Sequence, residues 1–216
     1  RFNEKFGNKN ISFSFPSIKV ESFDIALLEK ISSVRKSGLT FAIESGSVSG
    51  QKVINKTVLQ EKINEIINYA SKNGWRLIKL YFMIGLPYVE NELQEIINYI
   101  DNILKIDRKI RINLNISVFV PKAHTVFQYE SQLPLEKSIE KLDHISRYYA
   151  RTRVKLKLHN PYSSYIEGFI ARGDSAVGMA VYEAFTNGAK FDSWKEYFNF
   201  EVYKNAFEKH DITYEK

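Results

Sequence analysis

The chain contains no cysteine among its 216 residues. This absence excludes disulfides, a cysteine nucleophile, and a zinc site or iron–sulfur cluster ligated by cysteines of this chain. Long apolar runs are absent too, since no window reaches the roughly 18 consecutive apolar residues of a membrane-spanning helix. The polar start has no signal-peptide core. We therefore expect a cytoplasmic protein without a membrane partner.

Several common catalytic motifs are also missing. The sequence has no Walker loop, no G-x-G-x-x-G after a strand, no H-E-x-x-H and no G-x-S-x-G. The classes of enzyme that depend on these motifs are not predicted.

The composition is that of a folded protein. Hydrophobic residues make up 44% of the chain and aromatic residues 14%, enough to bury a sizeable core. The formal net charge is +6, and a basic excess of this size is compatible with nucleic acid or another anionic partner. The chain starts at Arg1 rather than at Met, so we expect it to be a fragment of a longer polypeptide.

Four strand-like runs are separated by segments with helical periodicity. The runs are residues 11–15, 39–44, 76–85 and 110–120. The helical segments between them follow Ser22, a capping box from Thr57 to Gln60, and Pro87. Alternating strands and helices predict an α/β fold with parallel strands.

The pattern changes near residue 133. Beyond it we expect a helix over 135–149, an exposed or edge strand over 154–159, helix over 163–187 with a break at Gly173, and an aromatic tail. Residues 1–133 are thus predicted to form one domain, and residues 134–216 a mostly helical C-terminal extension packed on it.

The predicted strands have one apolar face and one polar face, because successive strand residues point to opposite sides. The apolar face should lie against helices. The polar face includes Lys79 and Tyr81 in the third run and Asn113 and Asn115 in the fourth. Two interpretations stay open: the polar face lines a barrel lumen with a polar ligand and water, or it faces solvent.

Ligands of α/β proteins bind beyond the carboxyl ends of the strands. The second run ends in Glu44, Ser45, Gly46 and Ser47, whose polar groups could bond ribose hydroxyls and an amino group; the alternative is an ordinary polar turn. The third ends at Ile84-Gly85, where an apolar wall and closely approachable backbone suit an adenine.

Two further residues are candidates for chemistry. His124, just past the fourth run, is a candidate acid or base, although a structural role is the alternative. Lys79 lies inside a predicted strand and could form a Schiff base; the alternative is an ion pair with Glu44.

The strand ends, taken together, resemble the radical S-adenosylmethionine (SAM) superfamily. The likeness is closest to a subfamily whose full-length members have a cobalamin-binding-like N-terminal region. It covers nearly the whole chain, through "SVRKSGLTFAIESGS" (33–47), "GWRLIKLYFMIGLP" (74–87), "SVFVPKAHTVFQYE" (117–130), "YIEGFIARGD" (165–174) and "NGAKFDSW" (187–194).

The resemblance implies a partial (βα)6 TIM-like barrel in which our four runs are the third to sixth strands. It also implies that SAM and a [4Fe–4S] cluster act together in reductive SAM cleavage and hydrogen abstraction from a substrate. The sequence does not identify this substrate, and RNA and protein are both candidates. By this likeness, Glu44, Ser45, Gly46 and Ser47 face the ribose and methionine part of SAM. Two pairs, Ile84 with Gly85 and Phe119 with Val120, border its adenine.

The chain departs from the family in one respect. It lacks the Cys-x-x-x-Cys-x-x-Cys loop that holds the cluster, and the first two strands are not apparent. We therefore expect a C-terminal portion that is inactive alone and relies on an N-terminal part of the same polypeptide. A non-catalytic binding or assembly module, for example for RNA, and a Lys79 Schiff-base barrel enzyme are the alternatives.

Overall fold

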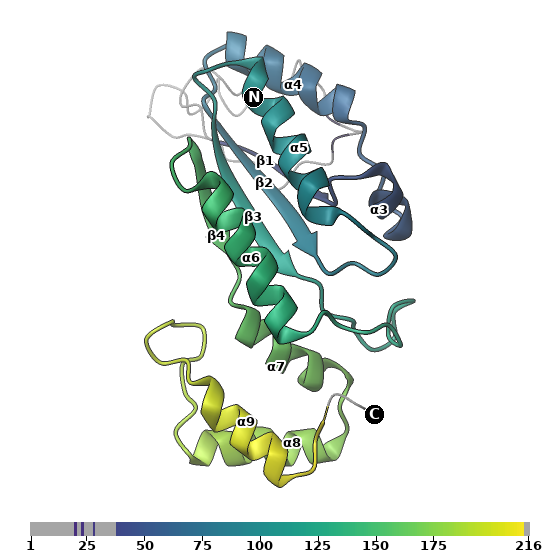
Figure 1. Cartoon of the computed structure of the whole chain (residues 1–216), viewed down its shortest axis with the longest axis vertical. Helices are drawn as coiled ribbons and strands as arrows, with labels where there is room; N and C mark the ends of the chain where they lie inside the picture. The colour runs from purple at the N-terminus through teal and green to yellow at the C-terminus, as the bar shows by residue number, and fades with distance from the viewer. Residues whose placement is uncertain (1–19, 21–22, 24–27, 29–37, 214–216) are drawn as a thin grey trace, which may run out of the picture. The chain divides into compact units, whose positions relative to one another are not determined.

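The computed structural model describes residues 38–213 together with Val20, Phe23 and Leu28 (Figure 1). Its strands are β1 (Leu39–Glu44), β2 (Leu77–Ile84), β3 (Arg111–Val118) and β4 (Val154–Leu158). Its helices are α3 (Val48–Val53), α4 (Gln60–Lys72), α5 (Glu92–Ile106), α6 (Leu135–Tyr149), α7 (Pro161–Arg172), α8 (Ser175–Thr186) and α9 (Phe200–Lys209).

The four strands form one all-parallel sheet in the order β1-β2-β3-β4. Phe41 of β1 lies opposite Leu80 of β2, and Leu114 of β3 lies opposite Leu156 of β4. Every connection contains a helix, as parallel neighbours require. The predicted α/β class is confirmed to this extent.

The chain divides into two compact units. The first comprises Arg1–Ser117 with Glu140–Leu158 and includes the sheet; the second comprises Val118–Ile139 with His159–Lys216 and includes α7, α8 and α9. The predicted domain boundary at residue 133 stays a prediction.

The predicted apolar face of the sheet is confirmed. The strand side chains on this face are buried, among them Phe41, Leu80, Phe82 and Leu114. Helix α5 packs on β2 and against α4, and the ring of Tyr99 meets that of Phe82 edge-on at 5.5 Å. The alternation of the strands therefore determines which side the helices cover.

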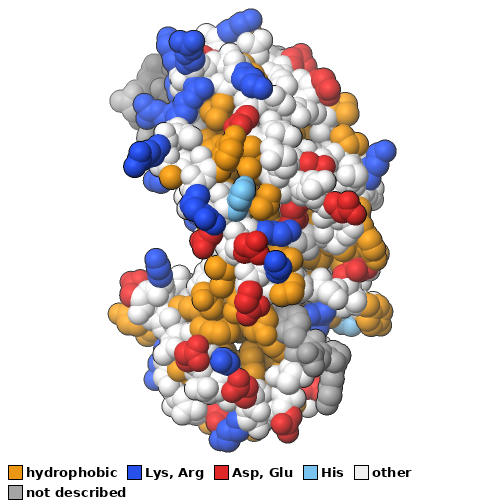
Figure 2. Space-filling view, viewed as in Figure 1, with side chains coloured by type: hydrophobic (Ala, Val, Ile, Leu, Met, Phe, Trp, Pro, Cys, Tyr) orange, Lys and Arg blue, Asp and Glu red, His pale blue; other side chains and the backbone are white. Residues whose placement is uncertain are grey.

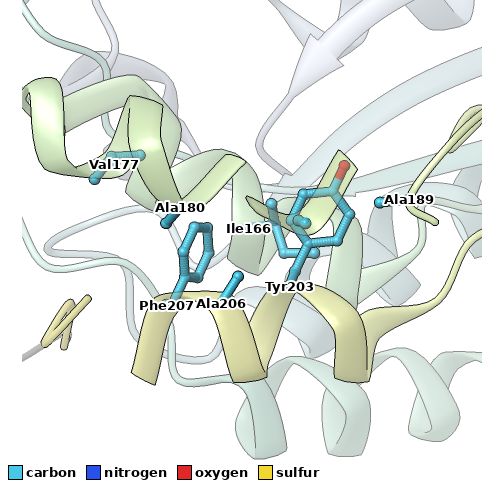
Figure 3. Packing of buried hydrophobic residues seen from close by; sticks show 8 residues of the cluster. Ile166, Val177, Ala180, Ala189, Tyr203, Ala206 and Phe207 are labelled. Atoms are coloured by element: carbon cyan, nitrogen blue, oxygen red, sulfur yellow. The ribbon is translucent and has the colours of Figure 1, made fainter. Parts of the chain in front are cut away.

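The second unit has a core of its own (Figure 3). Helices α8 and α9 pack closely because Ala180, Ala184 and Ala206 are small and fully or almost fully buried at their interface. Phe207 and Tyr203 fill the space beside them. The break predicted at Gly173 is confirmed, since α7 ends there and Asp174 caps α8.

Some expectations need correction. The capping box at Thr57 is wrong, because Leu59 precedes α4 and makes no side-chain cap. β4 is an edge strand of the described sheet, as its pattern predicted, but it extends the main sheet from within the supposed helical extension. The predicted strand at 11–15 and most of the helix after Ser22 lie outside the described residues.

Candidate functional site

The turn after β1 changes the direction of the backbone within two residues. The β1–β2 register shifts between Ala42 and Glu44, and Glu44 adopts a left-handed φ of 70°. The Ser47 side chain then caps α3 by accepting a hydrogen bond from the Gly50 N–H at 3.0 Å. The sequence did not predict this short helix, although a serine before a helix start is the expected capping signal.

The four predicted residues of this turn differ in accessibility. Glu44, Gly46 and Ser47 are partly exposed, whereas Ser45 is 2% exposed. The Ser45 hydroxyl lies 3.4 Å from that of Ser47, and a Cβ on Gly50 would approach it to 2.2 Å. Ser45 therefore supports the turn from within, while Glu44 and Ser47 present its accessible polar groups.

Gly46 lies against the backbone of α5. A Cβ at this position would come within 2.5 Å of the carbonyl carbon of Glu95 and 2.6 Å of the Ile96 nitrogen. No side chain can occupy that space, so the glycine is needed for close approach of the turn to the helix.

Buried Gln51 holds the turn in place. Its Nε2 donates to the Ser45 carbonyl at 3.0 Å, and its Oε1 accepts from the Val58 N–H at 2.8 Å. With an exposed fraction of 2%, it satisfies two backbone groups that no neighbouring strand reaches. Nothing in the sequence distinguished this glutamine from a surface residue.

Glu44 forms an ion pair with Lys56, whose Nζ lies 2.8 Å from Oε1. The predicted pair between Glu44 and Lys79 is not formed among the described residues. Lys79 is half-buried on the polar face of β2, next to Thr40 of β1.

The turn after β2 is closed by a buried carboxylate. Gly85 has a left-handed φ of 79°, and its N–H donates to Glu92 Oε2 at 2.8 Å. Glu92 is 4% exposed, and its other oxygen pairs with the Lys141 ammonium. The Gly85 N–H is thus already satisfied, and the Ile84 side chain is fully buried in the core. Neither the Gly85 N–H nor the Ile84 side chain is therefore free to contact an adenine, although the sequence predicted both as its neighbours.

The residues after β3 belong to the second unit. Phe119 is 8% exposed and packs edge-on against Phe127 at 5.5 Å. Val120 follows in a partly exposed segment. His124 has an exposed side chain and a left-handed φ of 62°. Its backbone N–H donates to the side-chain Oε1 of Gln128 at 3.2 Å. A left-handed turn residue of this kind favours the structural alternative for His124.

The second unit also contains a cavity of about 520 Å³. It is lined by residues of the segment after β3, of α7 and α8, and of the C-terminal segment, including Gln128, Phe169 and Arg172. The Arg172 guanidinium donates to the Glu130 carbonyl at 2.9 Å. No motif in the sequence pointed to this cavity.

The polar face of the sheet is partly open. On it Tyr81 is 40% exposed, and Arg111, Lys155 and Lys157 are exposed. The Asn115 amide reaches the Leu80 carbonyl at 3.5 Å. Both interpretations of this face, a lumen or a surface in solvent, remain compatible with it.

Two kinds of feature are absent from the described part of the chain. Within it, no group of three or more His, Cys, Asp or Glu side chains could hold a metal ion, and no helix combines the length and apolar character needed to cross a membrane.

Part of the chain is similar to a known protein. No family model matches the chain. Over 137 residues, 63% of its length, the chain is 32% identical to the uncharacterized protein MJ0966 of Methanocaldococcus jannaschii. That alignment spans 30% of the relative, so the aligned part of the chain corresponds to less than a third of it.

Proposed function

We propose that this chain is part of a radical SAM enzyme and forms part of its SAM site. In this proposal the sheet is a section of a partial (βα)6 barrel. The ordered strand-end motifs support it, as does the observation that β1 and β2, neighbouring parallel strands, both end in left-handed turns at Glu44 and Gly85. Such turns at the carboxyl edge of a parallel sheet are where α/β proteins bind ligands.

The accessible groups after β1 suit one part of SAM. The Glu44 carboxylate can accept hydrogen bonds from ribose hydroxyls or an amino group, and the Lys56 ammonium holds it in place. Ser47, three residues further along the turn, adds a partly exposed hydroxyl. Ser45 and Gly46 act by shaping the turn, because one is buried and the other lies against α5.

The adenine contact rests on fewer groups. Backbone at Ile84 and Gly85 is proposed to border the ring. In this family, bound SAM would supply the chemistry for hydrogen abstraction from a substrate. The residues of this chain would bind and orient SAM for it.

The cluster does not fit this chain. There is no cysteine in the sequence, and the described residues include no alternative group of ligands. We therefore derive no step through the cluster, and we assign its ligands and the cobalamin-binding-like region to other parts of a full-length protein. We propose that this full-length protein cleaves SAM and acts in the cytoplasm.

Binding of SAM to the chain tests the proposal directly. Isothermal titration calorimetry should detect weak binding, and Glu44→Gln should reduce affinity about tenfold, because a hydrogen bond to a charged acceptor is lost. Lys56→Gln is the matched control, since it breaks the same ion pair but keeps the carboxylate.

A second measurement uses the full-length polypeptide that the gene encodes. Anaerobic reconstitution should yield an iron–sulfur cluster, and reduction in the presence of SAM should yield 5′-deoxyadenosine. Absence of SAM binding in the chain and of 5′-deoxyadenosine in the longer protein would refute the proposal.

A further inference from the structure

Basic side chains gather where β2, β3 and β4 begin and continue onto the open face of the sheet. We call this surface the basic strip; it comprises Arg108, Lys109, Arg111, Arg153, Lys155 and Lys157. All six are exposed and belong to the first unit. Figure 2 shows Lys and Arg side chains at the end of the molecule where the strands start.

The strip surrounds a hollow at the start of the strands. A cavity of about 390 Å³ is lined by four of its members together with Arg76 and Ile110. Backbone hydrogen bonds hold the walls side by side, from the Arg111 N–H to the Arg76 carbonyl at 2.7 Å and from the Ile112 N–H to the Arg153 carbonyl at 3.4 Å.

Two guanidinium groups at this hollow are held in position. Arg153 donates to the carbonyls of Leu104 at 2.8 Å and Asp107 at 3.1 Å, at the end of α5. Arg76 donates to the Ser71 carbonyl at 2.8 Å. Fixed guanidinium groups lose less conformational entropy when an anion binds.

The positive charge of the strip is largely uncompensated. Among the described residues, one carboxylate forms an ion pair at the hollow: that of Asp107, 3.3 Å from the Arg76 guanidinium. The hydrogen bond from the Ser71 hydroxyl holds the pKa of Asp107 below its usual value. None of the six strip residues forms an ion pair with a described carboxylate, so the surface attracts anions.

The strip continues beside polar and aromatic side chains. In the β3–β4 register Asn113 lies opposite Lys155, and Asn115 lies opposite Lys157. Residues on the same face of a strand repeat about every 6.6 Å, a spacing similar to that of successive phosphates in an extended nucleic acid strand. Tyr81, on the same open face, is 40% exposed and offers a ring on which a base can stack.

We propose that the open face of the sheet binds single-stranded nucleic acid, with the basic strip on the phosphates and Tyr81 and Asn113 toward the bases. Guanidinium groups pair bidentately with phosphate oxygens. An unpaired strand is required because a base must leave a duplex to stack on Tyr81. The inference is tested separately from the SAM site, because its residues lie at the start of the strands and on the polar face, whereas the proposed SAM groups follow the carboxyl ends of β1 and β2.

Fluorescence anisotropy of a labelled oligouridine RNA tests the inference. The intact chain should bind, and affinity should fall steeply between about 50 and 200 mM salt. The double variant Lys155→Gln/Lys157→Gln should weaken binding about tenfold and reduce the salt slope by about 1.4, or about 0.7 for each lost phosphate contact. The matched control Lys195→Gln/Lys204→Gln removes the same charge from the second unit and should leave binding unchanged.

The variant Tyr81→Leu distinguishes the contribution of base stacking from that of the phosphate contacts. It should weaken binding at least fivefold, because stacking on one aromatic ring is lost, and leave the salt slope unaltered. Tyr182→Leu, an exposed tyrosine of α8, is its control. Circular dichroism checks that every variant keeps its fold, and Arg108→Gln provides a second test of the strip.

Four results would overturn the inference. The first is that the chain binds no RNA at low salt, and the second is that the Lys195/Lys204 control loses as much affinity as the Lys155/Lys157 variant. The third is that polyglutamate of equal charge displaces the RNA, and the fourth is that tripolyphosphate displaces it while Tyr81→Leu leaves the affinity unchanged. The last would indicate a site for small polyphosphates instead.

Discussion

Gly46 lies so close to α5 that the turn after β1 has no room for a side chain at this position. A Cβ there would lie 2.5 Å from the backbone of α5, which is too close for any relaxation of side chains alone. We expect Gly46→Ala to lower the free energy of unfolding by about 2 kcal/mol, through displacement of the turn or of α5. Urea denaturation followed by circular dichroism measures the change.

The control for this variant is another glycine in the same chain. Gly178 lies within α8, and a Cβ on it would meet nothing within 4 Å. Gly178→Ala should raise stability by about 0.5–1 kcal/mol, because alanine loses less backbone freedom in a helix. If both variants had the same effect, the close approach at Gly46 would be disproved.

At the scale of elements, Glu183 links α8 to the end of α9. Its carboxylate pairs with Lys209 at 2.6 Å and with His210 at 2.9 Å. These hydrogen bonds, the one from Lys209 first, hold the pKa of Glu183 below its usual value. A lowered folded-state pKa stabilises the protein above the unfolded-state pKa, and this stabilisation is lost as the pH falls through the folded-state pKa.

Glu183→Gln should therefore be less stable than the parent chain at neutral pH. The difference should shrink as the pH falls below the ordinary carboxyl range and disappear once the pH lies below the lowered folded-state pKa of Glu183. Thermal unfolding at a series of pH values measures it, with Glu196→Gln as a control on an exposed carboxylate. A difference that stayed constant with pH would show that the pairs do not stabilise α8 on α9.

At the scale of the whole molecule, stability should be highest in the middle of the sheet. β2 and β3 have hydrogen-bonded strands on both sides, and Leu80, Phe82 and Leu114 are almost completely buried. Their amides should exchange with deuterium at least tenfold more slowly than those of α9, because only large openings expose them. Hydrogen exchange followed by mass spectrometry measures this order. Equal rates in β2 and α9 would contradict it.

Part of this architecture follows from local sequence pattern. The runs at 39–44, 76–85 and 110–120 alternate clearly, so their existence and their buried faces could be predicted. Gly173 marks the break between α7 and α8, because it adopts an extended conformation that ends α7 and Asp174 then caps α8. The polar turn after β1 could also be predicted, because polar residues and a glycine follow the apolar strand.

Other features depend on residues far apart in the chain. The burial of Ser45, the hydrogen bond from Gly85 to Glu92 and the pairing of Glu92 with Lys141 involve partners that local sequence does not specify. These partners decide which polar groups at the strand ends remain accessible to a ligand.

The sequence by itself determined the α/β class, the alternating faces of the strands and the positions of most helices, because these depend on spacing within short segments. Only the tertiary structure decided that β4 joins the sheet, that Glu92 closes the turn after β2, and that the basic strip forms one surface. Strand pairing, buried hydrogen bonds and surface charge depend on which distant segments meet, and that is set by packing of the whole core.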